Sequence, residues 1–519
     1  MQTTMKDRII RLINQMQCRI YDKDTEIALS LLAAMAGESI LLLGPPGVAK
    51  SMVARRLKLA FRGAKGFEYL MSRFSTPDEI FGPVSISKLK ETDSYERCVD
   101  GYLPTADVVF LDEMWKAGPA IQNTLLTVMN EKLFRNGSHE LHLPLKLLVA
   151  ASNELPAQGE GLEALWDRFI IRLECRNISN DQLFLQMLTT PDDSDIEINA
   201  EDQISNEEYE KWSREIDDIK ISQPVLDAII AIRKSLRSVR VDADSELRNI
   251  YVSDRRWKNI IRLLRTSAFL QDRKAMELED LVPMYHCLWQ EPEERDAVRK
   301  TVIQAVFAMY ANRLAELKRA LKEEIKNAKI KRAAGQISER KLLRDSDKRL
   351  YYQLYYRVTG KGINDTFIMA SDFQMLPYYI TLNKDEGPEK GIMYKDKALH
   401  GKNVIRRYYD RNVAPIGSSL VILSRDDDHL YIDGVEYGVE KIPDGEKTLF
   451  SDAMLSDGVR LRDFSKEIDT LADDLQRTER AIYDNIFVSA ADKKEVKVYV
   501  ATFYKEMAFT RQDIGKIYD

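Results

Sequence analysis

The sequence predicts an α/β fold in which helices sandwich a parallel sheet. An all-α lid and a helical stalk follow, and a small β-rich module interrupts the stalk. Three observations predict this order. Short apolar runs alternate with helical patterns up to about residue 190, the pattern is then helical, and short strands return at about 351–450. At 519 residues the chain is also too long for one hydrophobic core, so we expect several domains.

Composition and charge narrow the possible partners. The chain is 44% hydrophobic and 31% charged, which allows buried cores beneath a charged surface. A net charge of only -6 argues against a protein that binds nucleic acid through a global basic field. Its longest apolar run, Ala28 to Leu43, is broken by Glu38, so we expect no membrane span. Four scattered cysteines without CxxC spacing suggest reduced thiols, and we expect a cytoplasmic protein.

The first candidate site follows the apolar run 39–43, which is typical of a buried parallel strand. A helical pattern starts at Met52, and the strand and the helix are joined by Gly44-Pro45-Pro46-Gly47-Val48-Ala49-Lys50-Ser51. In such a strand–loop–helix unit, backbone N–H groups and the helix N-terminus cradle phosphates. Lys50 is expected to reach the β- and γ-phosphates of ATP, and the Ser51 hydroxyl is expected to ligate Mg²⁺.

This loop departs from the usual pattern at Ala49, where a glycine normally precedes the lysine. We expect a methyl group to fit there only if the backbone is already helical. The competing interpretation of the motif alone is an ordinary turn that carries a surface lysine.

Two adjacent carboxylates follow a second buried run, at 107–111. Ligands bind at the carboxyl ends of the strands in an open α/β sheet, so the position suits a nucleotide site. Asp112 is expected to hold Mg²⁺, and Glu113 is expected to orient and polarise the attacking water. Alternatively, the two acids cap the next helix.

A third run, at 147–152, ends at Asn153, whose amide can hydrogen-bond the attacking water or the γ-phosphate. An Asx turn that closes the strand is the alternative. A fourth run, at 169–173, is preceded by Arg168. We expect this arginine on the ligand-facing rim of the sheet or at a neighbouring subunit.

With these motifs in place, the chain resembles the MoxR branch of the AAA+ ATPases and, within it, the RavA-like proteins. The resemblance covers about the first 265 residues and rests on GESILLLGPPGVAKSMVARRLK, EYLMSRFSTPDEIFGPVSI, GYLPTADVVFLDEMWKAGPAIQNTLLTVMNE, FRNG, LLVAASNELP, LEALWDRFIIRL and VSDRRWKNIIRLL. The alanine directly before the P-loop lysine also resembles the pattern of this branch, so Ala49 supports the resemblance.

The resemblance implies a role for each motif. Lys50 and Ser51 fall in Walker A, Asp112 and Glu113 in Walker B, and Asn153 at sensor 1. Arg168 resembles the arginine finger that completes a neighbouring subunit's site, with Arg172 as the competing choice. Arg255 resembles sensor 2, with Arg256 as its competitor.

Two segments predict β-hairpins that the resemblance identifies as the helix-2 insert and the pre-sensor-1 hairpin. The first, 95–103, predicts a strand, a turn and another strand. The second, 132–143, turns on Asn136-Gly137, which is the strongest short hairpin signal. In related rings such hairpins face the pore or the remodelled substrate.

The domain boundaries follow from changes of pattern. We expect an αβα core at 1–191, a lid at 192–293 after the acidic stretch near Asp192, a discontinuous helical domain at 294–347 and 457–519, and an inserted partner-binding β-rich module at 348–456. The helical domain is predicted by apolar stripes at three–four spacing, which should pack against each other. Their residues are Tyr310, Leu314, Leu317, Leu321 and Ile325, and Phe464, Ile468, Leu471, Leu475 and Ile482.

The leading hypothesis is therefore an Mg²⁺-dependent ATPase that forms a ring, expected to be a hexamer, and remodels or activates partner proteins in a chaperone-like way. A von Willebrand factor A-domain protein is the partner that the resemblance implies. The alternatives are a nucleic-acid-associated AAA+ motor and a nucleotide-gated scaffold with little turnover. The near-neutral charge weighs against the motor.

Overall fold

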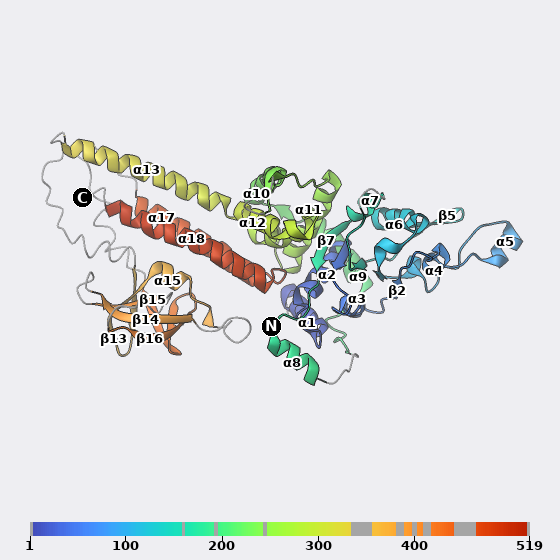
Figure 1. Cartoon of the computed structure of the whole chain (residues 1–519), viewed down its shortest axis with the longest axis horizontal. Coiled ribbons are helices and arrows are strands. Elements are labelled where there is room, and N and C mark those ends of the chain that lie inside the picture. The colour runs from blue at the N-terminus through green and yellow to red at the C-terminus, as the bar shows by residue number, and fades with distance from the viewer. Residues whose placement is uncertain are drawn as a thin grey trace. The chain divides into compact units, whose positions relative to one another are not determined.

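The computed structural model describes residues 4–157, 161–190, 196–241, 247–333, 355–379, 389–396, 402–407, 417–440 and 463–515 (Figure 1). The chain divides into two compact units. The first comprises Met1–Val306 with Ala481–Ser489, and the second comprises Phe307–Arg480 with Ala490–Asp519. No helix in these described ranges is long and apolar enough to cross a membrane.

A parallel sheet with strand order β2-β3-β6-β1-β7 forms the centre of the first unit. All of its neighbouring strands run in the same direction. The central strands are buried along their whole length, as expected when helices cover both faces of a sheet. The strands are β1 Ser39–Leu43, β2 Gly66–Leu70, β3 Val108–Asp112, β6 Leu147–Ser152 and β7 Phe169–Glu174.

Helices α2 and α3 contact the sheet, and α1 contacts both of them. Almost every residue of α2 is buried, which explains why its sequence is apolar all round. The helices of this region are α1 Met5–Gln17, α2 Asp24–Ala36, α3 Lys50–Leu59, α4 Pro77–Phe81, α5 Ile86–Thr92, α6 Pro119–Glu131 and α7 Glu163–Trp166, with the 3₁₀ turns η1 Leu103–Thr105 and η2 Met114–Lys116.

The rest of the first unit is mainly helical, as the sequence predicts. Its helices are α8 Asp181–Thr189, α9 Asn206–Asp217, α10 Gln223–Ser235, η3 Leu236–Ser238, α11 Asp254–Leu270, η4 Leu278–Cys287, η5 Pro292–Glu294 and α12 Arg295–Val306. Two short strand pairs join them: β8 Lys220–Ile221 with β11 Ala275–Met276, and β9 Val239–Arg240 with β10 Leu247–Arg248. Helix α11 packs on α2, which ties this helical layer to the sheet layer.

One of the two expected hairpins is present. Strands β4 (Leu133–Asn136) and β5 (His139–His142) pair antiparallel around Gly137, whose φ of 63° suits glycine. The prediction of a hairpin at 95–103 is wrong. In the structure, Arg97 of this segment forms an isolated β-bridge with Val84. Between these bridge partners the chain forms helix α5, whose first turn is capped by the Ser85 hydroxyl, so capping chemistry decides the local structure.

The two segments nevertheless meet. The Asn136 side chain, at the end of β4, accepts a hydrogen bond from the Arg97 N–H at 2.6 Å and donates one to the Arg97 carbonyl at 3.1 Å. A Cβ atom at Gly137 would lie 2.9 Å from the Tyr95 carbonyl oxygen. The 95–103 segment and the β4–β5 hairpin are therefore in direct contact.

Helices α13 (Ala308–Ala333) and α17 (Phe464–Asp484) carry the two predicted stripes, and helix α18 (Ala490–Gly515) also belongs to the second unit. The α13 stripe is buried from Tyr310 to Leu321, and the Tyr310 hydroxyl lies 2.6 Å from the Thr478 hydroxyl of α17. The helical segment predicted at 294–347 is interrupted at Phe307, between α12 and α13, and its residues 334–347 lie outside the described ranges.

The predicted β-rich module is a closed barrel, β12-β13-β15-β14-β16-β17-β18. Its strands are β12 Tyr355–Gly360, β13 Ile363–Met369, β14 Glu389–Asp396, β15 Lys402–Arg407, β16 Ser419–Arg425, β17 His429–Ile432 and β18 Val435–Glu440, and α15 Ala370–Gln374 follows β13. Alternation along β16 buries Val421 and Leu423 and exposes Leu420 and Ile422, so one face fills the barrel. Within the region at about 351–450 where the sequence predicts short strands, residues 380–388 lie outside the described ranges.

Candidate functional site

The phosphate-loop candidate joins β1 to α3. Lys50 begins α3, and its ammonium group donates hydrogen bonds to the Gly44 carbonyl at 2.6 Å and to the Pro45 carbonyl at 2.9 Å. The side chain is 9% exposed and therefore lies within the curl of the loop. This placement puts a positive charge among backbone N–H groups at a helix N-terminus, which is the arrangement that binds phosphate.

Position 44 requires a glycine because two backbone segments approach each other closely there. A Cβ atom there would lie 2.2 Å from the Cys175 carbonyl oxygen, just beyond the end of β7, so no larger residue fits. The Gly44 N–H donates to the Ser152 carbonyl at 3.0 Å, at the end of β6. The loop is thus clamped between its two neighbouring strands at the carboxyl edge of the sheet.

The conformation of Ala49 corrects an expectation. Its φ of 62° and ψ of 22° are left-handed, not helical, and it stands immediately before α3. A non-glycine residue in this region costs about 1–2 kcal/mol. The surrounding loop holds Ala49 in this strained backbone conformation. Strained residues of this kind cluster at functional sites.

The two carboxylates lie at the same edge. Asp112 ends β3, and its carboxylate accepts a hydrogen bond from the Glu113 N–H at 2.9 Å. Glu113 also has a left-handed backbone, with a φ of 52°, and its carboxylate lies 3.2 Å from the Lys116 ammonium. This turn directs the chain away from the sheet just after the strand, so both acids are half-buried at its edge.

Sheet register brings Asn153 to the same place. Ser152 pairs with Leu43, the residue before Gly44, so Asn153 follows β6 beside the start of the phosphate loop. On the other side of β6, Leu111 pairs with Ala150. Lys50, Asp112, Glu113 and Asn153 therefore lie along three adjacent strand ends, as the sequence predicts.

Arg168 lies at the opposite edge of the sheet, where the strands begin. It therefore does not lie on the ligand-facing rim of its own chain, which was one of the two positions expected for it. It precedes β7, and Phe169 pairs with Ser39 at the beginning of β1. With five residues in β1 at about 3.3 Å each, the phosphate loop begins about 16 Å farther along the strand. The Arg168 guanidinium donates to the Asn130 side chain at 2.9 Å, and burial followed by the charge of Arg255 lowers its pKa.

Arg255, the other candidate arginine, lies beside Arg168. Its guanidinium is 3.5 Å from the carboxylate of Asp167 and is half-exposed. The Ser253 hydroxyl, which caps α11, donates to the same carboxylate at 2.9 Å. Asp167 therefore links the start of α11 to the segment that carries Arg168.

The two competing arginines are structural. Arg256 is fully buried and donates to the carbonyls of Cys287, Asp167 and Ile170 at 2.7–2.8 Å. Arg172 is also fully buried, with its guanidinium 4.0 Å from the centre of the Trp166 ring. Burial lowers the pKa of both guanidinium groups. Both guanidinium groups are engaged by backbone carbonyls of their own chain.

Two residues of this arrangement were not singled out from the sequence. Asp167 lies within the Trp166-Asp167-Arg168 motif and ion-pairs with Arg255, while Lys116 pairs with Glu113. Lys116 stands three residues after Glu113, so this spacing in the sequence could have indicated the ion pair. No comparable spacing signal links Asp167 to Arg255, because 88 positions of sequence separate the two residues.

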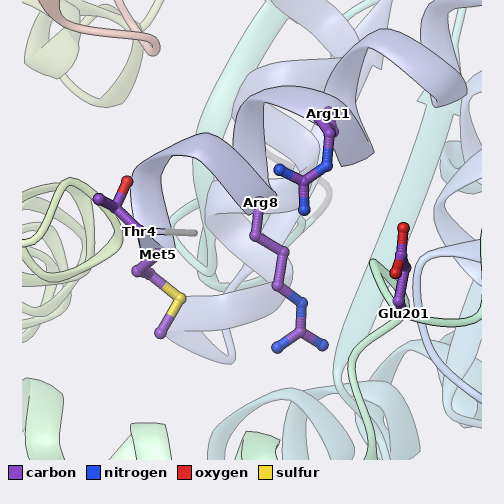
Figure 2. A pocket seen from close by; sticks show the side chains of 5 residues that line it. All are labelled: Thr4, Met5, Arg8, Arg11 and Glu201. Atoms are coloured by element: carbon purple, nitrogen blue, oxygen red, sulfur yellow. The ribbon is translucent and has the colours of Figure 1, made fainter. Parts of the chain in front are cut away.

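A separate pocket of about 330 Å³ lies beside α1 and is lined by Thr4, Met5, Arg8, Arg11 and Glu201 (Figure 2). Its two arginines are already engaged, since Arg8 pairs with Glu208 and Arg11 with Asp202, each at 2.6 Å. The pocket is therefore a neutralised surface hollow, and none of the phosphate-loop residues lines it.

Comparison with known proteins identifies relatives of the first unit. Residues 7–213 match the family model described as "MoxR domain in the MoxR-vWA-beta-propeller ternary systems", and residues 224–302 match a model of an AAA lid domain. The uncharacterised protein MJ0079 of Methanocaldococcus jannaschii is 34% identical over 60% of this chain and 78% of its own length.

Two further relatives are similar over parts of the chain. MJ0812, an uncharacterised protein of the same organism, is 35% identical over 62% of this chain and 83% of its own length. The structural protein ORF618 of Acidianus two-tailed virus is 36% identical over 29% of this chain and 25% of its own length.

Proposed function

Because the chain belongs to the MoxR family of AAA+ ATPases, we propose that it hydrolyses ATP, with Mg²⁺, as a ring of identical subunits that remodels or activates a partner protein. The observation that carries this proposal is the division of the candidate residues between two opposite edges of one sheet. Lys50, Asp112, Glu113 and Asn153 lie at one edge, and Arg168 and Arg255 lie at the other.

At the carboxyl edge, each residue has a distinct task. Lys50 and the loop N–H groups bind the phosphates of ATP, while Gly44, Pro45, Pro46, Gly47, Val48 and Ala49 shape the loop. Glu113 polarises the attacking water, and Asn153 orients it against the γ-phosphate. The Lys116 ammonium keeps the Glu113 carboxylate oriented at the end of β3.

The residues present fit a magnesium ion. Asp112 and Ser51 supply a carboxylate and a hydroxyl, the oxygen ligands that Mg²⁺ prefers, and Mg²⁺ typically keeps several waters besides one or two such ligands. When bound, the ion neutralises charge on the phosphate oxygens. The protein's own contribution is to hold Asp112 through the Glu113 N–H at the strand end.

Arg168 and Arg255 can contribute to ATP hydrolysis only at the nucleotide site of a second copy of the chain. An arginine that stabilises phosphoryl transfer is worth about 10³–10⁵ in rate, yet both arginines lie at the edge remote from their own phosphate loop. A head-to-tail contact brings them to the loop of the next copy, and such contacts close into rings. We infer a hexamer in which each active site contains residues of two subunits.

The partner is proposed to be a protein. The matching family model is described as part of ternary systems with vWA and β-propeller components, which supports a von Willebrand factor A-domain protein as the partner. The barrel of the second unit is the proposed partner-binding module, since the catalytic candidates all lie in the first unit.

Steady-state ATP hydrolysis by the purified chain tests the proposal. We expect Mg²⁺-dependent phosphate release that rises with protein concentration as rings assemble, and loss of ATP binding in Lys50→Ala. Adding a vWA-domain protein should change the rate. Absence of turnover in assembled rings would favour a nucleotide-gated scaffold, and stimulation by DNA or RNA alone would favour a nucleic-acid motor.

A further inference from the structure

The turn between α2 and β1, residues 36–38, is a point where two distant segments of the first unit meet. It stands just before β1, at the opposite end of that strand from the phosphate loop. From α11, the Arg262 guanidinium donates a hydrogen bond to the Ala36 carbonyl at 3.0 Å. From the same helix, the Asn259 amide donates one to the Glu38 carboxylate at 3.1 Å. Two side chains thus fasten α11 to the start of β1.

The base of the β4–β5 hairpin meets the same turn. Lys132 follows α6 and leads into β4, and its carbonyl accepts a hydrogen bond from the Leu143 N–H at 2.8 Å, which closes the hairpin. Its ammonium group lies over Gly37, since a Cβ atom at Gly37 would be only 2.8 Å from the Lys132 Nζ. Gly37 has a φ of 74°, so both its backbone and its missing side chain suit glycine. The hairpin base and α11 therefore reach the α2–β1 turn together.

The other end of the hairpin segment is anchored nearby. Lys146, three residues after Leu143, pairs with Asp107, and its ammonium lies 5.4 Å from the centre of the Tyr209 ring. The Tyr209 hydroxyl donates to the Ala34 carbonyl in the last turn of α2 at 3.0 Å. Both ends of the hairpin segment therefore carry a lysine that is held near the end of α2.

Glu38 and Lys132 are partly buried, so their charges interact more strongly than charges on the open surface. Burial raises the pKa of Glu38 to about 7. The positive charges of Lys132 and Arg262 oppose this rise, as does the hydrogen bond from Asn259. Burial lowers the pKa of Lys132, and the charge of Glu38 opposes that change. Each group of the pair thus stabilises the charged form of the other.

The charge of Glu38 therefore changes near neutral pH. The charged and titratable groups that face it are Lys132 after α6, Tyr209 of α9, Arg256 and Arg262 of α11, and Cys287 of η4. Burial raises the pKa of Tyr209 and Cys287, so both stay neutral near pH 7, and arginine keeps its charge. Above about pH 7 the Glu38 carboxylate attracts Lys132, and below this pH the attraction is lost.

We propose that Glu38 is a joint that couples α11 to the β4–β5 hairpin. The charged carboxylate holds the base of the hairpin to α11 through Lys132 and Asn259, and protonation releases it. Helix α11 carries Arg255 in its first turn, so a shift of this helix reaches the hairpin through one side chain. The inference goes beyond the proposed ATPase function and requires neither hydrolysis nor a ring.

A fluorescent probe on the hairpin tests the joint. The probe is attached to Ser138→Cys at the exposed tip, in a background in which the exposed Cys18 and Cys98 are replaced by serine. His139 and His142 are replaced by glutamine in every protein compared, so that no imidazole of the hairpin contributes. As the pH is lowered, the anisotropy of the probe should fall with a midpoint near pH 7, because the hairpin base is released.

Glu38→Gln should remove this transition and leave the anisotropy low at every pH, since the amide carries no charge. Glu131→Gln, which changes the exposed carboxylate next to Lys132 in the sequence, is the matched control and should keep the transition. Thermal unfolding at pH 8 should show that both variants remain folded. Absence of a transition in the parent protein, or its persistence in Glu38→Gln, overturns the inference.

Substitutions on α11 test whether that helix acts on the hairpin. Asn259→Ala removes the hydrogen bond to the charged carboxylate, so the midpoint reported from the hairpin should rise by about one pH unit. Lys258→Ala, at an exposed position of the same helix, should leave the midpoint where it is. Equal midpoints for Asn259→Ala and the parent protein would overturn the coupling. All of these measurements are made without ATP, so a failure of the proposed function, seen as absent phosphate release, is distinguished from a failure of the joint.

Discussion

The guanidinium of Arg255 lies 3.5 Å from the carboxylate of Asp167, the residue directly before Arg168. One arginine comes from the start of α11 and the other from the start of β7, so a single carboxylate joins the helical layer to the sheet layer. Movement of α11 relative to the sheet would therefore change the distance between the two arginine charges. We propose that this ion pair couples the nucleotide state to movement of α11.

Arg168→Ala should lower ATP turnover about 10³-fold in assembled rings, because an arginine that stabilises the transferred phosphoryl group is lost. Mixing Arg168→Ala with Lys50→Ala should restore part of the activity, since some sites then combine an intact loop with an intact arginine. Phosphate release across a mixing series measures the effect. Arg477→Ala, which removes an exposed arginine of α17, should leave turnover unchanged. Inactive mixtures of properly assembled rings would argue against action across subunits.

Arg256→Ala and Arg255→Ala should differ although the residues are adjacent. Removing the buried Arg256 leaves three backbone carbonyls without their donor, which should cost about 3 kcal/mol of unfolding free energy. Removing the half-exposed Arg255 should cost less than about 1 kcal/mol and act on turnover. Denaturant unfolding and ATPase rates separate the two effects, and equal losses of stability would contradict the distinction.

Glu113→Gln should retain ATP binding and lose about 10²–10⁴-fold in turnover, because the amide cannot accept a proton from the attacking water. Fluorescent-nucleotide binding and phosphate release measure the two properties. Glu131→Gln, at the exposed end of α6, provides the control. Turnover that survives in Glu113→Gln would remove Glu113 from its proposed role.

Ala49→Gly should preserve ATP binding and raise the unfolding free energy by up to about 1 kcal/mol. Glycine removes the strain of the left-handed backbone, although part of this gain is offset by its greater freedom in the unfolded chain. Ala54→Gly, in the interior of α3, should instead destabilise by about 1 kcal/mol. Thermal unfolding of the two variants compares them directly, and destabilisation by both would show that Ala49 is not strained.

Acid should destabilise the first unit through His286. Burial, with Arg295 and Arg299 nearby, lowers its pKa to about 3, from an ordinary value near 6.5. Below about pH 6.5 the unfolded state binds a proton that the folded state does not, so this residue reduces stability by about 1.4 kcal/mol per pH unit down to about pH 3. His286→Phe should remove this contribution. Unfolding free energies at pH 7, 6 and 5 measure the slope, and equal slopes for both proteins would contradict the assignment.

Local patterns predicted much of the first unit. Apolar runs followed by Gly44, Asp112 and Asn153 placed the strands and their functional ends, since parallel strands present their carboxyl ends at one edge. The insert near Tyr95 was predicted wrongly, because the Ser85 cap and the following helix outweigh a weak strand pattern. Ala49 was also predicted wrongly, because a left-handed backbone is imposed by the clamped loop and not by the alanine.

The sequence by itself determined the chemistry of this protein: a phosphate loop, paired carboxylates and a polar amide, each recognisable because it depends on neighbouring residues. Only the tertiary structure distinguished the adjacent arginines by their burial. Arg255 and Arg256 are adjacent in sequence, yet one points to a surface carboxylate and the other fills a buried site. Helix direction and strand register set which side chain is buried, and those properties arise from contacts between residues far apart in the chain.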